Sequence, residues 1–487
     1  MNTKRTLFLF LLTGFFAATI GTAANRPDLV IFLTDDHSQA DLSPYGSTAL
    51  RTPNMQRLAN AGLTFTDAYA ASPTCAPSRA AMLTGFMPAR NGAEANHSKP
   101  RADLKKWPAY FQELGYEVVA FGKVSHYRHT ADYGFDFFTH DTFHDHAGIP
   151  AAVEFLKNRP RTGVKSLCLF VGSNWPHVPW PETDLGYDPD QLPLPASSVD
   201  TLATRAWRAR YAAAVTKADT ELGLILEATR TCLGTNTLIL FSGDQGAQWP
   251  FAKWNCYEAG VRVPLVVAWP GVVKPRTRTA AMVSWVDFLP TLLEAAGGKP
   301  PRGLDGCSFL PLLQGKRNRH RDRIFSTHSG DDNWNIYPIR AVREGDWKYI
   351  RNLHPEFAFT THIDLPGNLG QRAYFATWEA TAQTNAAAAA IVKRYHARPE
   401  EEFYNLTADP HEQHNLAADP ACAKRLKKLR GELDDWMLGQ SDQRTVFGQP
   451  RLLSDPDSYG PNAPSGNARR EPPAGKALGE ARKPNTQ

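Results

Sequence analysis

Two pairs of oxygen-bearing side chains stand shortly after apolar runs in distant parts of the chain. The pairs are Asp35-Asp36, after the run Leu29–Leu33, and Asp244-Gln245, after the run Thr237–Phe241. If both runs are buried parallel strands, the four side chains meet at one carboxyl edge, where ligand sites of open α/β sheets lie. Their hard oxygen donors suit Ca²⁺ or Mg²⁺. Taken alone, an Asp-Asp pair after a strand is also an ordinary turn or helix cap.

The most informative segment covers residues 73–85 and reads PTCAPSRAAMLTG, with Cys75 and Arg79 at its centre. A lone cysteine is commonly a buried structural residue. Here, however, the whole segment resembles the signature of type I sulfatases in the alkaline-phosphatase-like superfamily. The resemblance implies that a formylglycine-generating or sulfatase-maturing enzyme oxidises Cys75 to formylglycine, whose hydrated aldehyde is the nucleophile. A thiolate would leave a stable thiosulfate ester, whereas the second hydroxyl of a geminal diol can expel sulfate.

Four basic residues lie in segments that resemble further sulfatase motifs, in the order that the family has. They are Lys123 and His126 in GKVSH, His177 in WPHVP, and Lys253 in PFAKW. Any one of them alone is more simply a solvated lysine or a capping histidine. A sulfate ester needs cations around its oxygens as the S–O bond breaks, and a proton donor for the leaving oxygen.

The family resemblance also implies a metal. It assigns one divalent cation, Ca²⁺ in preference to Mg²⁺, to Asp35, Asp36, Asp244 and Gln245, together with the modified residue Cys75. The family commonly has Asn or His at the position of Gln245, and Gln keeps an amide oxygen as a donor.

The remaining roles come from the same resemblance. Arg79 and Lys123 steady the formylglycine and the surroundings of the metal. His126 removes the proton from the second hydroxyl, which drives elimination of sulfate. His177 and Lys253 hold the sulfate and protonate the leaving group.

The substrate is less clearly marked than the chemistry. The spacing from Asn91-Gly92 to His97 resembles that of N-sulfoglucosamine sulfohydrolases, the heparan sulfamidases, whereas the stretch Trp249–Arg262 looks more like other carbohydrate sulfatases. His97 could bind a sugar or simply cap a loop. We therefore expect a sulfatase acting on a sulfated carbohydrate, such as a polysaccharide fragment, with heparan sulfamidase as the alternative.

Two further classes stay open. A phosphoesterase of the same superfamily would use a Ser or Thr nucleophile and Asp/His clusters for two zinc ions, and the second cluster is not found in the sequence. A non-catalytic glycan-binding homologue would have lost catalytic positions, yet each of them is filled.

The elements that must position these residues alternate between strand and helix over the first two thirds of the chain. This order predicts an α/β fold with a large mixed, mostly parallel sheet between helices, over residues 25–330. A smaller C-terminal α+β domain is expected over 331–450, and a disordered tail over 451–487. The elements expected include strands at Tyr116–Phe121 and Ser166–Val171, helices at Thr204–Thr229 and Lys424–Leu438, and a hairpin at Arg340–Asn352.

Composition and the N-terminus bound the setting. The 487 residues carry 54 Lys plus Arg against 49 Asp plus Glu, a net charge of +5, with no basic stripe that would indicate nucleic-acid binding. Residues 1–24 have the order of a secretory signal peptide, and their apolar run is too short for stable membrane insertion. We expect an exported protein, periplasmic or secreted. The six scattered cysteines leave the disulfide pairing open.

Overall fold

The computed structural model describes residues 26–139, 146–160, 162–331, 335–365 and 372–460, together with residue 463. The expected signal peptide and nearly all of the expected tail beyond Gly460 lie outside these residues. Within the described residues, no helix combines the length and the apolarity needed to cross a membrane.

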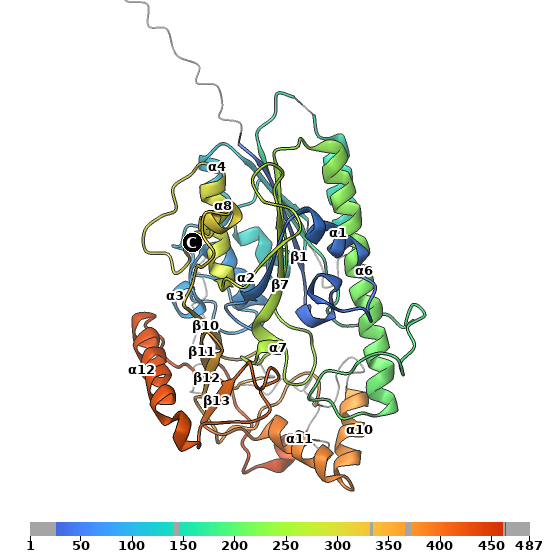
Figure 1. Cartoon of the computed structure of the whole chain (residues 1–487), viewed down its shortest axis with the longest axis vertical. Helices are drawn as coiled ribbons and strands as arrows, with labels where there is room; N and C mark the ends of the chain where they lie inside the picture. The colour runs from blue at the N-terminus through green and yellow to red at the C-terminus, as the bar shows by residue number, and fades with distance from the viewer. Residues whose placement is uncertain are drawn as a thin grey trace, which may run out of the picture.

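A nine-stranded sheet forms the body of the molecule (Figure 1). Its path is β4-β3-β5-β1-β6-β7-β2-β8, and β9 pairs with β2. All pairs are parallel except those that β7 makes with β6 and β2, so the sheet is mixed and mostly parallel, as predicted. The strands are β1 (Asp28–Thr34), β2 (Leu63–Tyr69), β3 (Glu117–Gly122), β4 (Phe137–Thr139), β5 (Leu167–Gly172), β6 (Thr237–Gly243), β7 (Arg262–Ala268), β8 (Thr277–Thr279) and β9 (Val283–Ser284).

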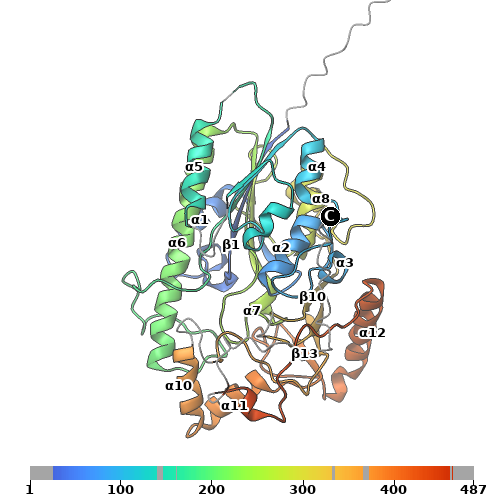
Figure 2. The same ribbon diagram turned by 180° about the vertical axis from the view of Figure 1, so that it is seen from behind.

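Helices cover both faces of this sheet (Figures 1 and 2). Because side chains alternate along a strand, Val30 and Phe32 of β1 enter the core on one face, and Leu29 and Ile31 enter the core on the other. The first core is closed by α1 (Pro53–Ala61), α5 (Gly148–Asn158) and α6 (Leu202–Cys232). The second is closed by α2 (Cys75–Thr84), α4 (Trp107–Glu113) and α8 (Phe288–Ala295). Shorter helices are α3 (Pro88–Asn91), α7 (Glu258–Val261) and α9 (Leu310–Leu313).

The C-terminal part forms a second, antiparallel sheet in the order β10-β11-β12-β13. One face packs on α12, and the other joins the core that α10 and α11 share with α6. The predicted hairpin is confirmed, but β10 already belongs to this sheet and lies before the expected boundary at residue 330. The elements are β10 (Arg323–His328), β11 (Ile339–Glu344), β12 (Trp347–Asn352), β13 (Glu401–Asn405), α10 (Arg372–Ala382), α11 (Ala386–His396) and α12 (Ala423–Gly439).

The start of the expected disordered tail is ordered. Residues 451–460 were expected to begin a disordered tail, but Leu452 forms a β-bridge with Phe357, and Leu453 N–H donates to the Glu356 carbonyl (3.0 Å). This stretch is therefore part of the folded chain.

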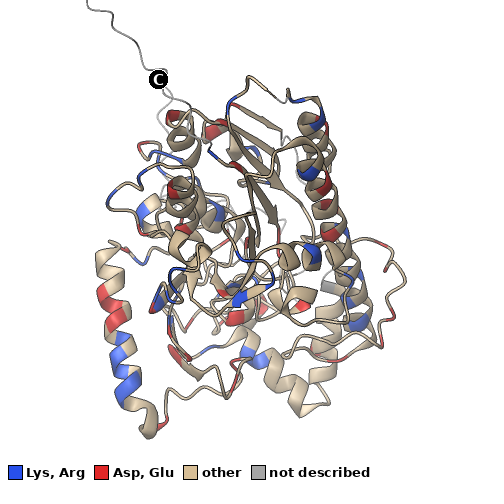
Figure 3. Ribbon diagram, turned by 45° about the horizontal axis from the view of Figure 1, so that its top comes forward, with Lys and Arg blue, Asp and Glu red and all other residues tan. Residues whose placement is uncertain are grey.

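Helix α12 carries its basic side chains in the first half and its acidic ones in the second (Figure 3), opposite to the order that the helix dipole favours.

Candidate active site

The two acidic pairs meet where β1 and β6 end side by side. The strands pair in parallel up to Thr34 and Gly243, so the residues after them leave the sheet at the same edge. Asp36 has a φ of 61°, and its N–H donates to Asp244 Oδ1 (3.0 Å). Oxygens of Asp35, Asp36 and Asp244 all lie within 4.8 Å of one another, and all three side chains are buried. The predicted convergence is confirmed by this geometry.

Cys75 is the first residue of α2 and lies against this cluster. Its thiol donates to Asp35 Oδ1 (3.4 Å) and accepts from Gln245 Nε2 (3.1 Å), and Lys123 Nζ is 3.8 Å away. Burial, and then the charge of Asp35, raise the pKa of the Cys75 thiol. Because the thiolate is the reactive form of cysteine, the unmodified side chain is poorly suited to act as a nucleophile at neutral pH.

Each of the three acids has a cationic partner. Arg79, one turn after Cys75 in α2, donates from Nε to Asp244 Oδ2 (2.8 Å). Lys123, which comes directly after β3, donates to Asp35, and Lys253 Nζ donates to Asp36 Oδ2 (2.8 Å). The cations are buried, so each would be unstable there without its carboxylate.

The electrostatics distinguish the three acids. Although burial opposes ionisation, Lys123 and His177 hold the pKa of Asp35 well below its usual range. Burial raises the pKa of Asp36 to about 6 and that of Asp244 to about 7, because their cations only partly offset the loss of water. Asp36 and Asp244 are therefore protonated more readily than exposed carboxyl groups, in spite of their cationic partners.

These residues fit a hard divalent cation. The side-chain oxygen of Gln245, Oε1, is buried and accepts no hydrogen bond within the described residues, while its Nε2 points at Asp36 Oδ1 (2.6 Å) and Cys75. Turning the amide over would present Oε1 to the carboxylates in place of Nε2. Three carboxylates and an amide oxygen are the donor set that Ca²⁺ and Mg²⁺ prefer.

The predicted histidines lie on two sides of the cluster. His177 Nε2 is 3.7 Å from Asp36 Oδ2, and its Nδ1 donates to the Val178 carbonyl (2.6 Å). His126 Nε2 is 2.7 Å from His97 Nδ1, and His97 Nε2 is 3.2 Å from an oxygen of Asp331. His97, expected to contact substrate or to cap a loop, thus has both ring nitrogens engaged.

Sequence reasoning missed the residues that hold this second side together. Asp331 comes after β10 in a loop, and its buried carboxylate accepts from Trp254 Nε1 (2.7 Å) and Asn96 Nδ2 (2.9 Å). Nothing in the sequence marks Asp331, because its partners come from loops far away in the chain. Asn96 stands next to His97, which was the only signal available.

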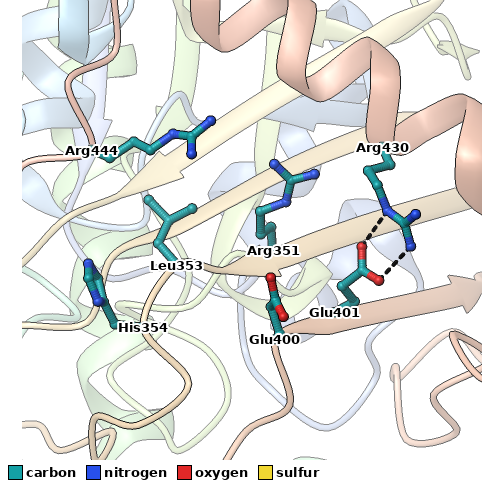
Figure 4. A pocket seen from close by; sticks show the side chains of 7 residues that line it. All are labelled: Arg351, Leu353, His354, Glu400, Glu401, Arg430 and Arg444. Carbon is teal, nitrogen blue, oxygen red and sulfur yellow. Dashed lines mark hydrogen bonds and ion pairs between the residues drawn. The ribbon is translucent and has the colours of Figure 1, made fainter.

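A more open cavity of about 700 Å³ lies on the second sheet (Figure 4). Arg430 donates to both oxygens of Glu401 (2.7 and 2.6 Å), and Arg351 donates to Asp434. These charges largely neutralise one another, so the buried cluster around Cys75 is the better candidate for catalysis. The lining residues are Arg351, Leu353, His354, Glu400, Glu401, Arg430 and Arg444.

The sequence of the chain is similar to those of known sulfatases. The family profile "Sulfatase" matches residues 27–298, and "N-sulphoglucosamine sulphohydrolase, C-terminal" matches residues 246–365. An ulvan-active sulfatase of Formosa agariphila is 32% identical over 428 residues, which cover 86% of this chain and 81% of that protein. Human N-sulphoglucosamine sulphohydrolase is 26% identical over 464 residues, covering 86% and 91%.

A solved structure extends the likeness to the fold. It is a protein in complex with its substrate D-glucosamine-2-N,6-O-disulfate, and it superposes with a TM-score of 0.63 at 21% identity, covering 86% of this chain and 99% of its own. At that identity the likeness concerns the fold alone. The profile match and the Formosa relative carry the assignment further: the chain belongs to the sulfatase family and is a sulfuric ester hydrolase.

Proposed function

We propose that this enzyme removes sulfate from a sulfated saccharide, using formylglycine formed from Cys75 and one divalent metal ion, Ca²⁺ in preference to Mg²⁺. The single observation that carries the proposal is the position of Cys75 at the start of α2, in contact with Asp35, Gln245 and Lys123. Its neighbours are the acids, amide and cations that the sulfatase resemblance assigns to this chemistry.

Formylglycine and the metal ion would each supply one function. Formylglycine, when hydrated, supplies the nucleophilic hydroxyl, and the metal supplies Lewis acidity toward a sulfate oxygen. Asp35, Asp36, Asp244 and Gln245 would hold the metal. The cations hydrogen-bonded to the three carboxylates keep these oriented before substrate arrives, so little reorganisation is needed during the reaction.

The basic residues would divide the remaining work. Arg79 and Lys123 hold Asp244 and Asp35 in place and keep positive charge beside residue 75. Lys253 lies 2.8 Å from an oxygen of Asp36, and His177 lies 3.7 Å from the same oxygen, so both can hold sulfate and one can protonate the leaving oxygen. His126 is the base for the second hydroxyl.

Relatives support a saccharide substrate. The Formosa relative is named an ulvan-active sulfatase, and the human relative is named for N-sulphoglucosamine. The higher identity to the former favours a sulfated polysaccharide fragment, and the C-terminal profile match at residues 246–365 keeps the sulfamidase alternative open.

A zinc phosphoesterase and a purely glycan-binding homologue find less support in the described residues. Besides the groupings at Cys75, Asp287, Cys307 and His320 form the only other cluster there with metal-ligand geometry. Arg321 donates to both oxygens of Asp287, which disfavours a cation at that place. The phosphoesterase therefore lacks a supporting second site, and a role in glycan binding alone does not account for the intact cluster.

Maturation and location belong to the proposal as well. Cys75 would need a formylglycine-generating or sulfatase-maturing partner, and the signal peptide proposed for residues 1–24 would direct the protein to the periplasm or outside the cell.

A substrate panel tests the proposed function. Protein coexpressed with a maturation enzyme is assayed for sulfate release from N-sulfated glucosamine and from 6-O-, 4-O- and 2-O-sulfated sugars. Cys75→Ala is the inactive variant, and Cys422→Ala, a half-buried cysteine of the C-terminal part, is the matched control. Release from O-sulfated sugars supports the proposal, release from the N-sulfated sugar alone establishes the sulfamidase alternative, and turnover of phosphodiesters alone would overturn both.

A further inference from the structure

His97 connects a buried carboxylate to the histidine proposed as the base. Its Nε2 lies 3.2 Å from Asp331 Oδ1, and its Nδ1 lies 2.7 Å from His126 Nε2. We propose that Asp331 and His97 are positioning residues that hold His126 in the tautomer with a proton on Nε2 and a free lone pair on Nδ1. The inference rests on the proposed function for the role of His126, but the tautomer itself can be measured without turnover.

The first link is the fixed acceptor at Asp331. Its carboxylate is 2% exposed and receives hydrogen bonds from Trp254 Nε1 (2.7 Å) and Asn96 Nδ2 (2.9 Å). An indole nitrogen can only donate, so Asp331 must accept. The amide of Asn96 cannot be reversed without loss, because its Oδ1 accepts from the N–H of Ala76 (3.0 Å), the residue after Cys75.

Ionisation of Asp331 is consistent with this role. Although burial opposes it, the hydrogen bond from His97 and the neighbouring His362 hold the pKa of Asp331 well below its usual range. A carboxylate that already accepts from two donors accepts a third from His97, so His97 Nε2 carries its proton.

The second link takes His97 as a neutral imidazole, which has one donor and one acceptor, as the proposal requires. With its proton on Nε2, His97 accepts at Nδ1, and the contact of 2.7 Å requires His126 Nε2 to donate. Burial, with the nearby charge of Lys123, holds the pKa of His126 well below its usual range, so its ring is neutral. The remaining nitrogen, Nδ1, is buried and makes no hydrogen bond within the described residues.

The backbone around His97 supports a constrained ring. His97 has a φ of 60°, in the left-handed region that a side chain such as histidine adopts at an energetic cost. The preceding residue is tied to the same loop, because the N–H of Asn96 donates to the carbonyl of Gly330 (2.9 Å). A residue that only capped a loop would not need both of its ring nitrogens aligned between a carboxylate and a second imidazole.

The chain of hydrogen bonds suits a base. A proton that reaches His126 Nδ1 makes the ring cationic, and its Nε2–H stays bonded to His97, whose own N–H stays bonded to the Asp331 carboxylate. The new positive charge is thus partly compensated by Asp331 without any movement of the rings. Holding a catalytic imidazole in the correct tautomer is worth orders of magnitude in turnover in other enzymes.

Nitrogen NMR tests the tautomer directly. Protein labelled with ¹⁵N-histidine and still carrying cysteine at position 75 is used, and long-range proton–nitrogen spectra report which ring nitrogen is protonated. His126 is assigned by comparison with His126→Gln. The expected result is protonation of His126 at Nε2 in the wild type and loss of that preference in His97→Leu. No change is expected in His129→Leu, whose ring adjoins His126 but lies outside the hydrogen-bond relay of Asp331, His97 and His126. Protonation at Nδ1 in the wild type, or the same tautomer in His97→Leu, would overturn the inference.

Kinetics of the matured enzyme separate positioning from substrate contact. His97→Leu should lower kcat by about 10²-fold with KM changed less than about threefold. His97→Asn, whose amide oxygen can accept from His126 Nε2, should recover about tenfold of that loss. A raised KM with kcat unchanged would instead make His97 a substrate residue and contradict the inference. If the wild type releases no sulfate but shows the expected tautomer, the proposed function fails and the hydrogen-bond relay stands.

Discussion

Raising the pH should destabilise the elements that pack against α2, because a histidine outside the site, His320, loses its proton. Asp287 ends the 3₁₀ turn Trp285–Asp287, which leads into α8, and both the turn and α8 pack against α2. Its buried carboxylate accepts from His320 Nε2 (3.1 Å) and from Arg321 Nε (2.7 Å). Although burial opposes protonation, the hydrogen bond to Asp287 raises the pKa of His320 to about 9.

The magnitude is set by this shift. An unfolded histidine titrates near 6.5, and each pH unit between the unfolded and folded values corresponds to about 1.4 kcal/mol. Because the folded pKa is the higher one, the stabilisation is complete below about pH 6.5 and is lost as the pH rises through about 9. His320 should therefore contribute about 3 kcal/mol at pH 6 that is absent at pH 10.

Urea unfolding followed by tryptophan fluorescence at pH 6 and pH 10 measures the effect. The matched variant His320→Gln keeps a donor for Asp287 but does not titrate, so its unfolding free energy should change less with pH than that of the wild type by about 3 kcal/mol. His414→Gln, at a side chain that is 81% exposed, should behave as the wild type does. Equal pH dependence in wild type and His320→Gln would refute the reasoning.

Three further changes have defined outcomes. Lys253→Met should lower kcat by about 10²–10³-fold, because sulfate oxygens lose a preorganised cation. Lys428→Met on α12 should keep the wild-type rate, and equal rates for the two variants would remove Lys253 from the mechanism. In the wild type, chelation should lower the melting temperature and Ca²⁺ should restore it, as scanning fluorimetry measures. Asp244→Asn should show no such rise with Ca²⁺, and a normal Ca²⁺ response in that variant would argue against the proposed ligands. Phe241→Ala, at a side chain with 0% exposure, should lower the unfolding free energy by about 3–5 kcal/mol. Leu202→Ala, at 87% exposure, should lower it by at most about 0.5 kcal/mol. Similar losses for the two variants in urea titrations would contradict the assigned core.

The convergence of the acidic pairs could be predicted because it depends on local patterns. The apolar runs before Asp35 and Asp244 are continuous, as in strands buried on both faces. In two neighbouring parallel strands, the residues that follow each strand lie at the same edge of the sheet. The small apolar residues Ala80–Leu83 likewise predict a helix, although α2 begins earlier than that, at Cys75.

The features that could not be predicted depend on contacts between distant segments. Strand β7 contains Pro264, which argues against a central strand, yet its neighbours in the fold accommodate it between β6 and β2. Asp331 has no motif around it, and only the folded chain shows that Asn96 and Trp254 converge on it. The packing of α10 on α6 is equally non-local, because loops and strands separate the two helices in the sequence.

The central claim is that residue 75, once converted, is the sulfatase nucleophile within this buried cluster. The most direct measurement combines peptide mass spectrometry of residue 75 with sulfate release by the same preparations, made with and without a maturation enzyme. The account predicts that sulfate release rises in proportion to the fraction of residue 75 present as formylglycine and is absent in Cys75→Ala. Release that persists in Cys75→Ala, or that does not change with the extent of conversion, would contradict it.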